Sequence, residues 1–563
     1  MTSLSFLDVS NSDFGLHLNL ASFLNLNPAL SELHLSRCEL HNESLSPTNL
    51  NFSIRSNIQH LDLSRNQIKG RFPSLLTNIS SLRVLDLHDN FLRFTIPVMP
   101  NLLKLDISGN KFKDIGHVGI WRQCHLKQLR VSRNYFGEEM IGMSTNTSEC
   151  SQYGLEVLHL DHNELNGSIP ESIIKMTNLR VLDMSSNKLV NLIPKSLGGL
   201  KILEVLDLSS NQLNGKIPIS IGKLCNLKFL NLSNNNLEGT IYESHFANLS
   251  MLAYLDVSLN RNLTLDVSRE WKPPFNLTIV QLSSCKIKAE FPMWLRTQRN
   301  IKKLVLSNTS ISGPLPTWFK QMPVIPHLDL SGNNLTGPLT NLPLGDGSYG
   351  FQDEHRGSLL LLNNLFNGSI PNSLCKRTSI EILDISNNRL SGKIPTCIGN
   401  LQKMRAMILS NNTLSGVIPS SIGMNSLLSW LHLDGNHLTG ELPQEMANLR
   451  HLWVLNLGNN EFTGLIPDWI SELTGLMVLG LHKNNFTGRI SPSLCKNACL
   501  RIFDVGHNKL KGHLPNCLGE LHGMIDPGYC RRYFYSKENM IQVWKGHEYT
   551  FAHSLPLLFN MDL

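Results

Sequence analysis

The sequence predicts a single α/β solenoid, a coil built by stacking short repeats of one kind, and three observations predict it. An asparagine recurs with a constant step of 24 residues from Asn388 to Asn508. The residues before it alternate between apolar and polar, as in LDIS (383–386). Glycine and proline follow at fixed distances, as Gly392 and Pro395 do. So regular a repeat overrides the prior of about three or four domains for a chain of this length.

Each repeat is predicted to begin with a short strand. In LDIS, Leu383 and Ile385 point inward and Asp384 points outward, which is the alternation of a half-buried strand. Asn388 stands at the next corner, where its amide can bond to the backbone of neighbouring coils and form a ladder. We count 21 turns with such an anchor. The further anchors are Asn11, Asn66, Asn90, Asn110, Asn134, Asn163, Asn187, Asn211, Asn235, Asn260, Asn333, Asn364, Asn412, Asn436, Asn460, Asn484 and Asn508, with Cys38, Cys285 and Thr309 in the same slot.

The rest of the repeat turns the chain back. Gly392 permits a tight turn, and Pro395 ends local strand pairing because it has no N–H to donate. One repeat cannot bury its own leucine face, so stacking of neighbouring coils must supply the core.

Composition narrows the class of partner and the compartment. The net charge of +6 is small for 563 residues and forms no dense basic stripe, so we expect no nucleic-acid binding; a weak preference for acidic polysaccharide stays open. No apolar run is long enough to cross a membrane, and residues 1–27 do not read as a signal peptide. Fourteen glycosylation sequons nevertheless favour secretion. Their acceptors are Asn42, Asn51, Asn78, Asn146, Asn166, Asn231, Asn248, Asn262, Asn276, Asn308, Asn334, Asn367, Asn411 and Asn485.

The spacing of the cysteines also favours secretion. Cys375 and Cys397 are 22 residues apart, and Cys495 and Cys517 repeat that spacing. Each pair falls on successive coils, where one strand spacing lies within the Cα separation that a disulfide needs. We therefore predict both bridges and an oxidising compartment. Cys124 and Cys150 form a third candidate pair, whereas Cys225 and Cys499 are expected to be buried and unpaired.

No chemistry-bearing motif indicates an enzyme. The chain has no Gly-rich phosphate loop, nucleophile elbow or kinase signature. Cys495 and Cys499 lack the second pair that a zinc site needs, and His547 and His553 are six residues apart rather than four. The recurring strand carboxylates, such as Asp183, reflect the repeat. We predict no catalytic residue, metal or cofactor.

Three segments depart from the repeat. The inserts near 138–154 and 342–357 are either tolerated surface loops or ligand-contacting loops. Beyond His522 the pattern stops, and only Met561–Leu563 resembles another strand. The predicted organisation is therefore about 21 repeats over 1–525, a non-repeat island over 526–554, and the start of a further repeat over 555–563.

The full motif, LxxLxLxxNxLxGxIPxxL, resembles the plant-specific 24-residue class of leucine-rich repeats. That resemblance implies a right-handed superhelical coil, a parallel sheet on its concave face, and a second, lateral strand built at the Ile-Pro step. The tyrosine-rich segment followed by VWKGHEY (543–549) is similar to the island of plant receptor-like proteins of the Cf and xylanase-receptor type. In that family about four more repeats and one transmembrane helix follow the island, and a Cys- and Trp-containing cap precedes the repeats. The resemblance therefore implies a truncated ectodomain.

The family's function supplies the expected role. It implies an extracellular ligand-recognition module in plant defence, on the outer face of the plasma membrane, that signals through a SERK-type co-receptor or an adaptor receptor kinase. Its ligand would be a protein or peptide, for example one derived from a pathogen. This chain would reach the membrane only through a segment it does not contain, and alone it would be soluble and apoplastic if secreted. The alternatives are a soluble inhibitor of cell-wall hydrolases and a truncated decoy or non-functional receptor product.

Candidate contacts follow from outward strand positions and from the island. For Trp430 and Trp453 the alternative is packing beneath a loop or the island, and the island rings could likewise merely pack on the coil. A glycan on Asn231 would obstruct the middle of the concave face, so we expect contacts away from that coil. The ligand candidates are Arg130, His159, Asp161, His162, Trp430, His432, Asp434, Trp453, Asn456, His482 and Lys483. The island candidates for partner contact are Tyr529, Arg531, Arg532, Tyr533, Tyr535, Trp544, Lys545 and Tyr549.

Overall fold

The computed structural model describes residues 4–15, 18–45, 56–113, 123–137, 153–288, 290–344, 357–525, 540–544, 547–551 and 560–562. It divides into two compact units, and each is treated by itself. Unit 1 comprises residues 1–288 and 293–300, and unit 2 comprises residues 289–292 and 301–563. None of the helices in the described ranges is long and apolar enough to cross a lipid bilayer.

The main sheet of unit 1 takes one three-residue strand from each coil, and every pairing is parallel and in register. The central residue of each strand from β2 onward is buried, because it is the inward leucine or valine of the repeat. The strands are β1 (Phe6–Asp8), β2 (Glu32–His34), β3 (His60–Asp62), β5 (Val84–Asp86), β7 (Lys104–Asp106), β8 (Gln128–Arg130), β9 (Val157–His159), β10 (Val181–Asp183), β11 (Val205–Asp207), β13 (Phe229–Asn231), β15 (Tyr254–Asp256) and β17 (Ile279–Gln281).

Unit 2 has a main sheet of the same kind, again with parallel pairing only. Its last strand, β39, pairs with β35, and the antiparallel hairpin of β37 and β38 lies between them in sequence. The strands of this main sheet are β19 (Lys303–Val305), β21 (His327–Asp329), β23 (Gly357–Leu360), β25 (Ile380–Asp384), β27 (Ala406–Ile408), β29 (Trp430–His432), β31 (Val454–Asn456), β33 (Val478–Gly480), β35 (Ile502–Asp504) and β39 (Asn560–Asp562). The separate hairpin consists of β37 (Met540–Trp544) and β38 (His547–Phe551).

Lateral strands follow the anchor in many coils and form shorter parallel sheets. The expected second strand is thus present, but in β26 it ends at Gly392, before Ile394 and Pro395. Pro395 instead caps the short helix η12. In unit 1 the lateral strands are β4 (Lys69–Gly70), β6 (Phe91–Leu92), β12 (Asn214–Lys216), β14 (Asn236–Ile241), β16 (Asn262–Leu265) and β18 (Lys286–Ile287). In unit 2 they are β20 (Ser312–Pro314), β22 (Asn334–Gly337), β24 (Leu365–Gly368), β26 (Arg389–Gly392), β28 (Thr413–Gly416), β30 (His437–Gly440), β32 (Glu461–Phe462), β34 (Thr487–Gly488) and β36 (Lys509–Leu510).

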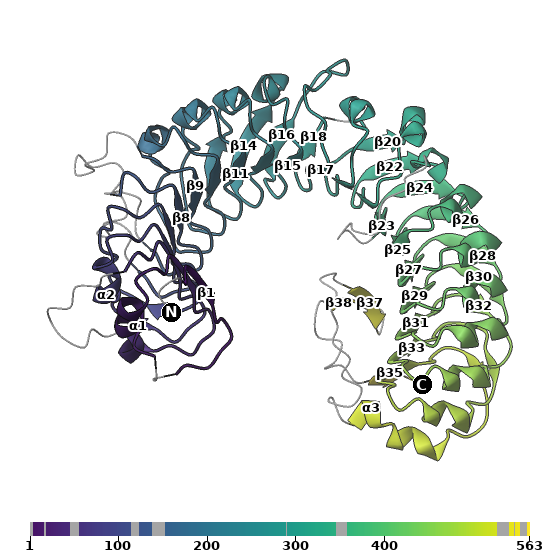
Figure 1. Cartoon of the computed structure of the whole chain (residues 1–563). Helices are drawn as coiled ribbons and strands as arrows, with labels where there is room; N and C mark the ends of the chain where they lie inside the picture. The colour runs from purple at the N-terminus through teal and green to yellow at the C-terminus, as the bar shows by residue number, and fades with distance from the viewer. Residues whose placement is uncertain are drawn as a thin grey trace. The chain divides into compact units, whose positions relative to one another are not determined.

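Short helices form the side of each unit opposite its main sheet, and within each unit the main sheet lies on the concave side (Figure 1). Most are single 3-10 turns that begin directly after the repeat proline. Unit 1 has α1 (Leu20–Leu26), η1 (Asn42–Leu45), α2 (Ser74–Thr77), η4 (Glu171–Lys175), η5 (Lys195–Gly199), η6 (Ile219–Lys223), η7 (Glu243–Phe246) and η8 (Met293–Thr297). Unit 2 has η9 (Thr317–Gln321), η10 (Leu339–Asn341), η11 (Asn372–Lys376), η12 (Thr396–Asn400), η13 (Ser420–Met424), η14 (Gln444–Asn448), η15 (Asp468–Glu472), η16 (Pro492–Lys496), η17 (Asn516–Glu520) and α3 (His522–Ile525).

The predicted asparagine ladder is confirmed. The amide nitrogen of Asn211 donates to the carbonyl of Met184 on the preceding coil at 3.0 Å and to that of Leu208 on its own coil at 3.2 Å. Its oxygen accepts from the backbone N–H of Leu189 at 3.0 Å. The residues that replace asparagine make the donor half of the ladder: Cys38 to Val9 at 3.3 Å, Cys285 to Val257 at 3.1 Å and Thr309 to Leu306 at 2.9 Å.

Two disulfides join neighbouring helices of unit 2, as the spacing predicts. Cys375 in η11 bonds to Cys397 in η12 with a Cα–Cα distance of 5.8 Å. Cys495 in η16 bonds to Cys517 in η17 with a Cα–Cα distance of 5.9 Å. Both tie one coil to the next on the helical side and leave the main sheet untouched.

The other cysteines correct two expectations. Cys499 is not unpaired but disulfide-bonded, and its partner lies outside the described residues. Cys225 is unpaired as expected, but it is exposed rather than buried because its helical corner faces solvent. Cys124 is also disulfide-bonded. Its predicted partner, Cys150, lies outside the described residues, so that pairing stays a prediction.

Candidate functional site

Outward residues of the main sheets stack into columns that face the concave side. In each three-residue strand the middle residue is buried, so the first and third residues point the other way. Because successive strands pair in register, first residues lie beside first residues and third beside third. A ligand on this side would therefore meet two parallel rows of side chains.

The open face of unit 1, as we name it, consists of these two columns over β9, β10, β11, β13, β15 and β17. Its side chains are half-buried, apart from the buried Asp256. The first column is apolar and aromatic: Val157, Val181, Val205, Phe229, Tyr254 and Ile279. The third column is polar and mainly acidic: His159, Asp183, Asp207, Asn231, Asp256 and Gln281.

The carboxylates of the open face are held in place by the turn that follows each strand. Asp183 accepts from the backbone N–H and the hydroxyl of Ser185 at 3.0 and 2.7 Å, and Asp207 accepts from Ser209 at 2.9 and 2.6 Å. Burial raises the pKa of Asp207; the bonds from Ser209 oppose that rise, while the nearby Asp183 charge adds to it. Two adjacent, partly dehydrated carboxylates favour a cationic or hydrogen-bond-donating ligand.

The predicted contacts near β9 come together. His159 Nδ1 lies 3.7 Å from Asp161 and 3.6 Å from Asp183, and His162 Nδ1 lies 3.0 Å from Asp161. Hydrogen bonds from His159 to Asp161 and then to Asp183 raise its pKa to about 9, so His159 is protonated at neutral pH. Arg130 pairs with His159 in register on the neighbouring strand and is exposed.

Asp161 lies at the centre of this group and contacts both histidines and Ser132. Burial of its carboxyl raises the pKa, but hydrogen bonds from His159, Ser132 and His162 outweigh burial and hold the pKa well below its ordinary value. Asp161 is therefore ionised, and its negative charge is balanced within the protein. Arg130, Asp183 and Asp207 remain half-buried or exposed at the surface, where a ligand can reach them.

Aromatic side chains extend the apolar column. Phe229 and Tyr254 stack with ring centroids 4.0 Å apart, and the Tyr254 hydroxyl accepts from Gln281 Nε2 at 3.1 Å. Burial, with Asp256 and Asp207 adding to it, raises the pKa of Tyr254 to about 12. The phenol is thus neutral and offers an apolar ring with a polar end.

Three groups in unit 1 have the residue types that could hold a metal ion. Their ligand atoms lie within 4.8 Å of one another, and the groups are Glu32, His34 and His60; Asp86, His88 and Asp106; and His159, Asp161 and Asp183. The first has two histidines, with Glu32 Oε1 lying 2.9 Å from both His34 Nε2 and His60 Nδ1. That donor set suits a transition metal best, whereas the protonated His159 disfavours the third group.

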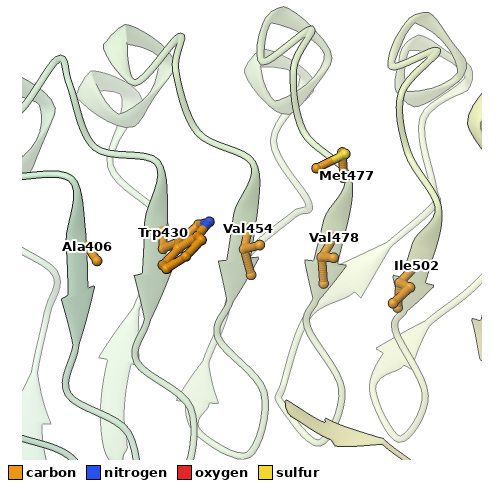
Figure 2. Close-up of a cluster of buried hydrophobic side chains, with 6 residues drawn as sticks. All are labelled: Ala406, Trp430, Val454, Met477, Val478 and Ile502. Atoms are coloured by element: carbon orange, nitrogen blue, oxygen red, sulfur yellow. The ribbon is translucent and has the colours of Figure 1, made fainter. Parts of the chain in front are cut away.

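In unit 2 the same columns are closed. We define the closed face as the first outward residues of β27, β29, β31, β33 and β35 together with the third residues of β29, β31 and β33; the third residues of β27 and β35, Ile408 and Asp504, are half-buried. Its first column, Ala406, Trp430, Val454, Val478 and Ile502, forms one apolar cluster with Met477, as Figure 2 shows. The side chains are at most 8% exposed. The equivalent residues of unit 1 are half-buried, so the same column differs in exposure between the two units.

This burial corrects the expectation of an exposed tryptophan on the concave sheet. Trp430 is 8%, His432 4% and Asn456 3% exposed, and Asp434 is also buried. Ser410 donates to Asp434 at 2.7 Å. Side chains this deeply buried offer little surface to an external ligand, and their roles as ligand contacts stay predictions.

The neighbouring candidates are more accessible. Trp453 is half-buried and packs against the closed face. His482 Nδ1 lies 3.1 Å from Asp504, and Lys483 is exposed in the turn after β33. Their roles as ligand contacts stay predictions.

The island candidates are only partly placed. Trp544 belongs to β37 and Tyr549 to β38, whose backbones pair antiparallel. The other predicted contacts of the island, Tyr529, Arg531, Arg532, Tyr533, Tyr535 and Lys545, lie outside the described residues.

Most predicted glycosylation acceptors face solvent. Asn231 and Asn485 are half-buried, and Asn51 and Asn146 lie outside the described residues. Asn231 belongs to the open face: its amide donates to Asp207 at 3.1 Å and accepts from the Ser233 N–H and hydroxyl at 3.1 and 2.7 Å. The remaining acceptors are exposed: Asn42, Asn78, Asn166, Asn248, Asn262, Asn276, Asn308, Asn334, Asn367 and Asn411.

Sequence reasoning missed the apolar column and the role of the carboxylates beside it. It treated Asp183 and Asp207 as a solvated by-product of the repeat. A signal was available, because a β-branched aliphatic or an aromatic residue fills the first outward slot in six successive coils, from Val157 to Ile279. An outward slot on a solvated sheet has no reason to stay apolar so consistently.

Comparison with models of known protein families identifies the repeats as leucine-rich repeats. Models of the leucine rich repeat family match residues 153–213, 275–335 and 378–438, and shorter leucine-rich-repeat models match 57–79, 98–120, 203–224, 226–249 and 451–473. Together the matched segments make up about half of the chain.

Among curated relatives, Receptor-like protein EIX2 of Solanum lycopersicum is 31% identical over 163 residues, which are 29% of this chain and 13% of the relative. Receptor-like protein EIX1 of the same species is 49% identical over 61 residues, covering 11% of this chain and 6% of the relative. Receptor-like protein 15 of Arabidopsis thaliana is 33% identical over 149 residues, covering 22% and 15%. The alignments thus span only a small part of each relative.

Solved ectodomain structures of plant receptor kinases superpose on nearly the whole of this chain. The ectodomain of the Arabidopsis thaliana receptor kinase GASSHO1/SCHENGEN3, in complex with CASPARIAN STRIP INTEGRITY FACTOR 2, matches with a TM-score of 0.77 and 29% identity, covering 91% of this chain and 60% of that one. The Arabidopsis receptor kinase HAESA, in complex with the peptide hormone IDA and the co-receptor SERK1, matches with a TM-score of 0.70 and 29% identity, covering 93% and 89%. The repeat, the ladder and these matches together show that the chain belongs to the leucine-rich-repeat proteins, and over the aligned segments it is similar to plant receptor-like proteins.

Proposed function

We propose that this chain is an extracellular ligand-recognition module whose ligand is a protein segment or peptide, bound in extended form over the open face of unit 1. The observation that carries the proposal is the pairing of an accessible apolar column with an acidic one over β9, β10 and β11. Half-buried valines on a sheet surface leave apolar area in water, and such area marks an interaction site. The carboxylates beside them add selectivity for charge.

The arrangement favours a ligand with aliphatic side chains along one edge and basic or donor groups along the other. An aliphatic edge would lie over Val157, Val181 and Val205, and cationic groups would reach Asp183 and Asp207. Exposed Arg130 at one end suits an acidic group or a terminal carboxylate. Peptide complexes of the similar receptor kinases support a ligand of this class.

The finer role belongs to the same proposal. The relatives are receptor-like proteins, and one similar receptor kinase is bound to its co-receptor SERK1. We therefore propose defence signalling through a SERK-type co-receptor or an adaptor receptor kinase, with no catalysis by this chain. Disulfides and exposed sequons support an extracellular setting.

A binding series tests the site. Synthetic twelve-residue peptides that alternate lysine with leucine are titrated by fluorescence anisotropy, with alternating glutamate–leucine peptides for comparison. We expect the basic peptides to bind more tightly, and the Asp183→Asn, Asp207→Asn double variant to weaken them about tenfold, since a charged contact is removed while the Ser185 and Ser209 hydrogen bonds are kept.

The matched control is Asp504→Asn, at the same strand position on unit 2. Equal weakening by the control and the double variant would show that the effect comes from total charge, and it would overturn the placement on the open face. Tighter binding of the acidic peptides would overturn the proposed ligand chemistry.

A further inference from the structure

A cluster of cations and exposed aromatic rings lies on the lateral face of unit 1, away from the open face. We name it the basic–aromatic patch. It spans the coils of β3, β5, β7 and β8, and every member is exposed. The members are Lys69, Arg71, Phe91, Arg93, Phe94, Lys111, Lys113 and Tyr135.

The rings of the patch are held between cations. Lys111 Nζ lies 5.0 Å and Lys69 Nζ 5.9 Å from the centroid of Phe91. The guanidinium carbons of Arg93 and Arg71 lie 5.2 and 5.9 Å from the centroid of Phe94. Phe91 is 42% and Phe94 53% exposed. Two large rings and four cations thus share one solvent-facing surface.

Backbone pairing fixes the spacing of these groups. Lys69 of β4 stands opposite Phe91 of β6, and Lys111 donates its backbone N–H to Leu92 at 2.8 Å. Lys69, Arg93 and Lys113 each follow their coil's anchor by three residues. They therefore form a row of cations that repeats with the coil, at about 4.8 Å for stacked strands.

The charge of the patch is not neutralised within the described part of the chain. None of its five cations forms an ion pair with a carboxylate among the described residues. A lateral lysine three coils further on, Lys188, is instead paired with Glu164 at 3.0 Å. The patch thus presents unpaired positive charge on a chain of net charge only +6.

Phe94 adds a second, independent observation. It is four residues after its anchor, in the slot where Gly70, Gly215 and Gly392 stand in other coils. Those glycines have φ of 79°, 68° and 76°, and Phe94 is forced to the same conformation with φ of 79°. A bulky residue in the left-handed region is strained, and its ring is not buried in compensation. Strain of this kind marks a functional position.

We propose that the basic–aromatic patch binds a linear acidic polysaccharide that carries one carboxylate on each sugar, a polyuronate. The carbon–hydrogen faces of the sugars would pack on Phe91 and Phe94, and the carboxylates would pair with the flanking lysines and arginines. A regular polyanion matches a row of cations at a fixed repeat, whereas the acidic surface of a folded protein has irregular charge. This site is separate from the open face and does not depend on the peptide proposal.

The test uses the purified whole chain and oligomers of polygalacturonate, measured by isothermal titration calorimetry. We expect binding that weakens as ionic strength rises and that is lost with the fully methyl-esterified, uncharged oligomer. The Arg71→Gln, Arg93→Gln variant should lose most of the affinity. The matched control is Lys393→Gln, Lys511→Gln, at the same two repeat slots in unit 2, where neither lysine makes a cation–π contact with a ring of the described residues, and its affinity should be unchanged.

Phe94→Gly separates function from folding. Glycine relieves the positive φ, so the melting temperature of unit 1 should not fall, yet polygalacturonate affinity should fall about threefold or more because the ring and its cation contacts are lost. Unchanged affinity in this variant, or equal loss in the lysine control, would overturn the patch as the site. Binding of single-stranded DNA or anionic lipid vesicles as tightly as polygalacturonate would also overturn it, since that would indicate only a general attraction to polyanions.

Discussion

The open face of unit 1 and the closed face of unit 2 are built from the same repeat, the same ladder and the same strand positions, yet one is accessible and the other is buried. Val181 and Tyr254 are half-buried in the first, whereas Trp430 and Val454 are sealed in the second. The repeat therefore decides where a side chain points, but not how far it is buried. Ligand access has to be judged from tertiary packing.

The largest expected effect comes from removing a ring from the closed face. Trp430→Ala should lower the free energy of unfolding by about 3–5 kcal/mol, because it leaves a cavity in an apolar cluster. Tyr254→Ala, in the same column of the open face, should cost less than about 2 kcal/mol because that ring is still partly in water. Urea denaturation followed by circular dichroism measures both. An equal loss in the free energy of unfolding for the two variants would contradict the distinction between the open and the closed face.

The asparagine ladder should contribute equally to the free energy of unfolding in both units. Asn211→Ala in unit 1 and Asn436→Ala in unit 2 each remove a buried amide that bonds to the backbone of two coils. Each should cost about 2–3 kcal/mol, since buried carbonyl and N–H groups lose their partners. Threonine at the same position should cost less, because Thr309 already makes the donor bond to Leu306. Costs that differ strongly between the two units in urea denaturation would show that the ladder itself, and not its cover, differs.

A smaller effect is expected from pH. The pKa of His159 is raised to about 9 by its bonds to Asp161 and Asp183. The stability it contributes is therefore fully present below its unfolded value of about 6.5 and is lost as the pH rises through about 9. The group is partly exposed, so the loss should be on the order of 1 kcal/mol or less. Thermal unfolding between pH 6 and 9.5 should show this decline in the native chain and a weaker one in His159→Gln; identical slopes would count against the ion pair.

The smallest effect concerns glycosylation of the open face. Asn231 stands between Asp207 and Asp256 in the acidic column. If it carries a glycan, Asn231→Gln should leave binding over β9–β11 unchanged and should improve the affinity only of peptides long enough to reach Phe229 and Tyr254. Anisotropy with six- and twelve-residue basic peptides distinguishes the two. Improved binding of the short peptide as well would place the ligand over Asn231 itself.

Much of this architecture could be predicted from sequence because a repeat states each residue's role many times over. Leu383, Asn388 and Gly392 have the burial, bonding and turn conformation that their slots predict. Cys375 and Cys397 could be paired from their distance to the anchors alone. Local and nearest-neighbour contacts dominate such a coil, so a local pattern contains most of the information.

What could not be predicted depends on contacts outside the repeat. Trp430 and His432 occupy outward slots, and their burial is not encoded by the position in the repeat. The disulfide of Cys499, whose partner lies outside the described residues, was likewise not predicted. Phe94 escaped notice because its unusual property is a backbone angle, which is visible in sequence only as a missing glycine.

Hydroxyl-radical footprinting with mass spectrometry tests the central claim most directly. It compares the oxidation of Phe229 and Tyr254 with that of Trp430 in the folded chain, alone and with the alternating lysine–leucine peptide of twelve residues. We expect Phe229 and Tyr254 to be oxidised in the free chain and protected when the peptide is bound. Trp430 should be protected from oxidation in both samples. Ready labelling of Trp430 without ligand, or peptide protection confined to unit 2, would contradict it.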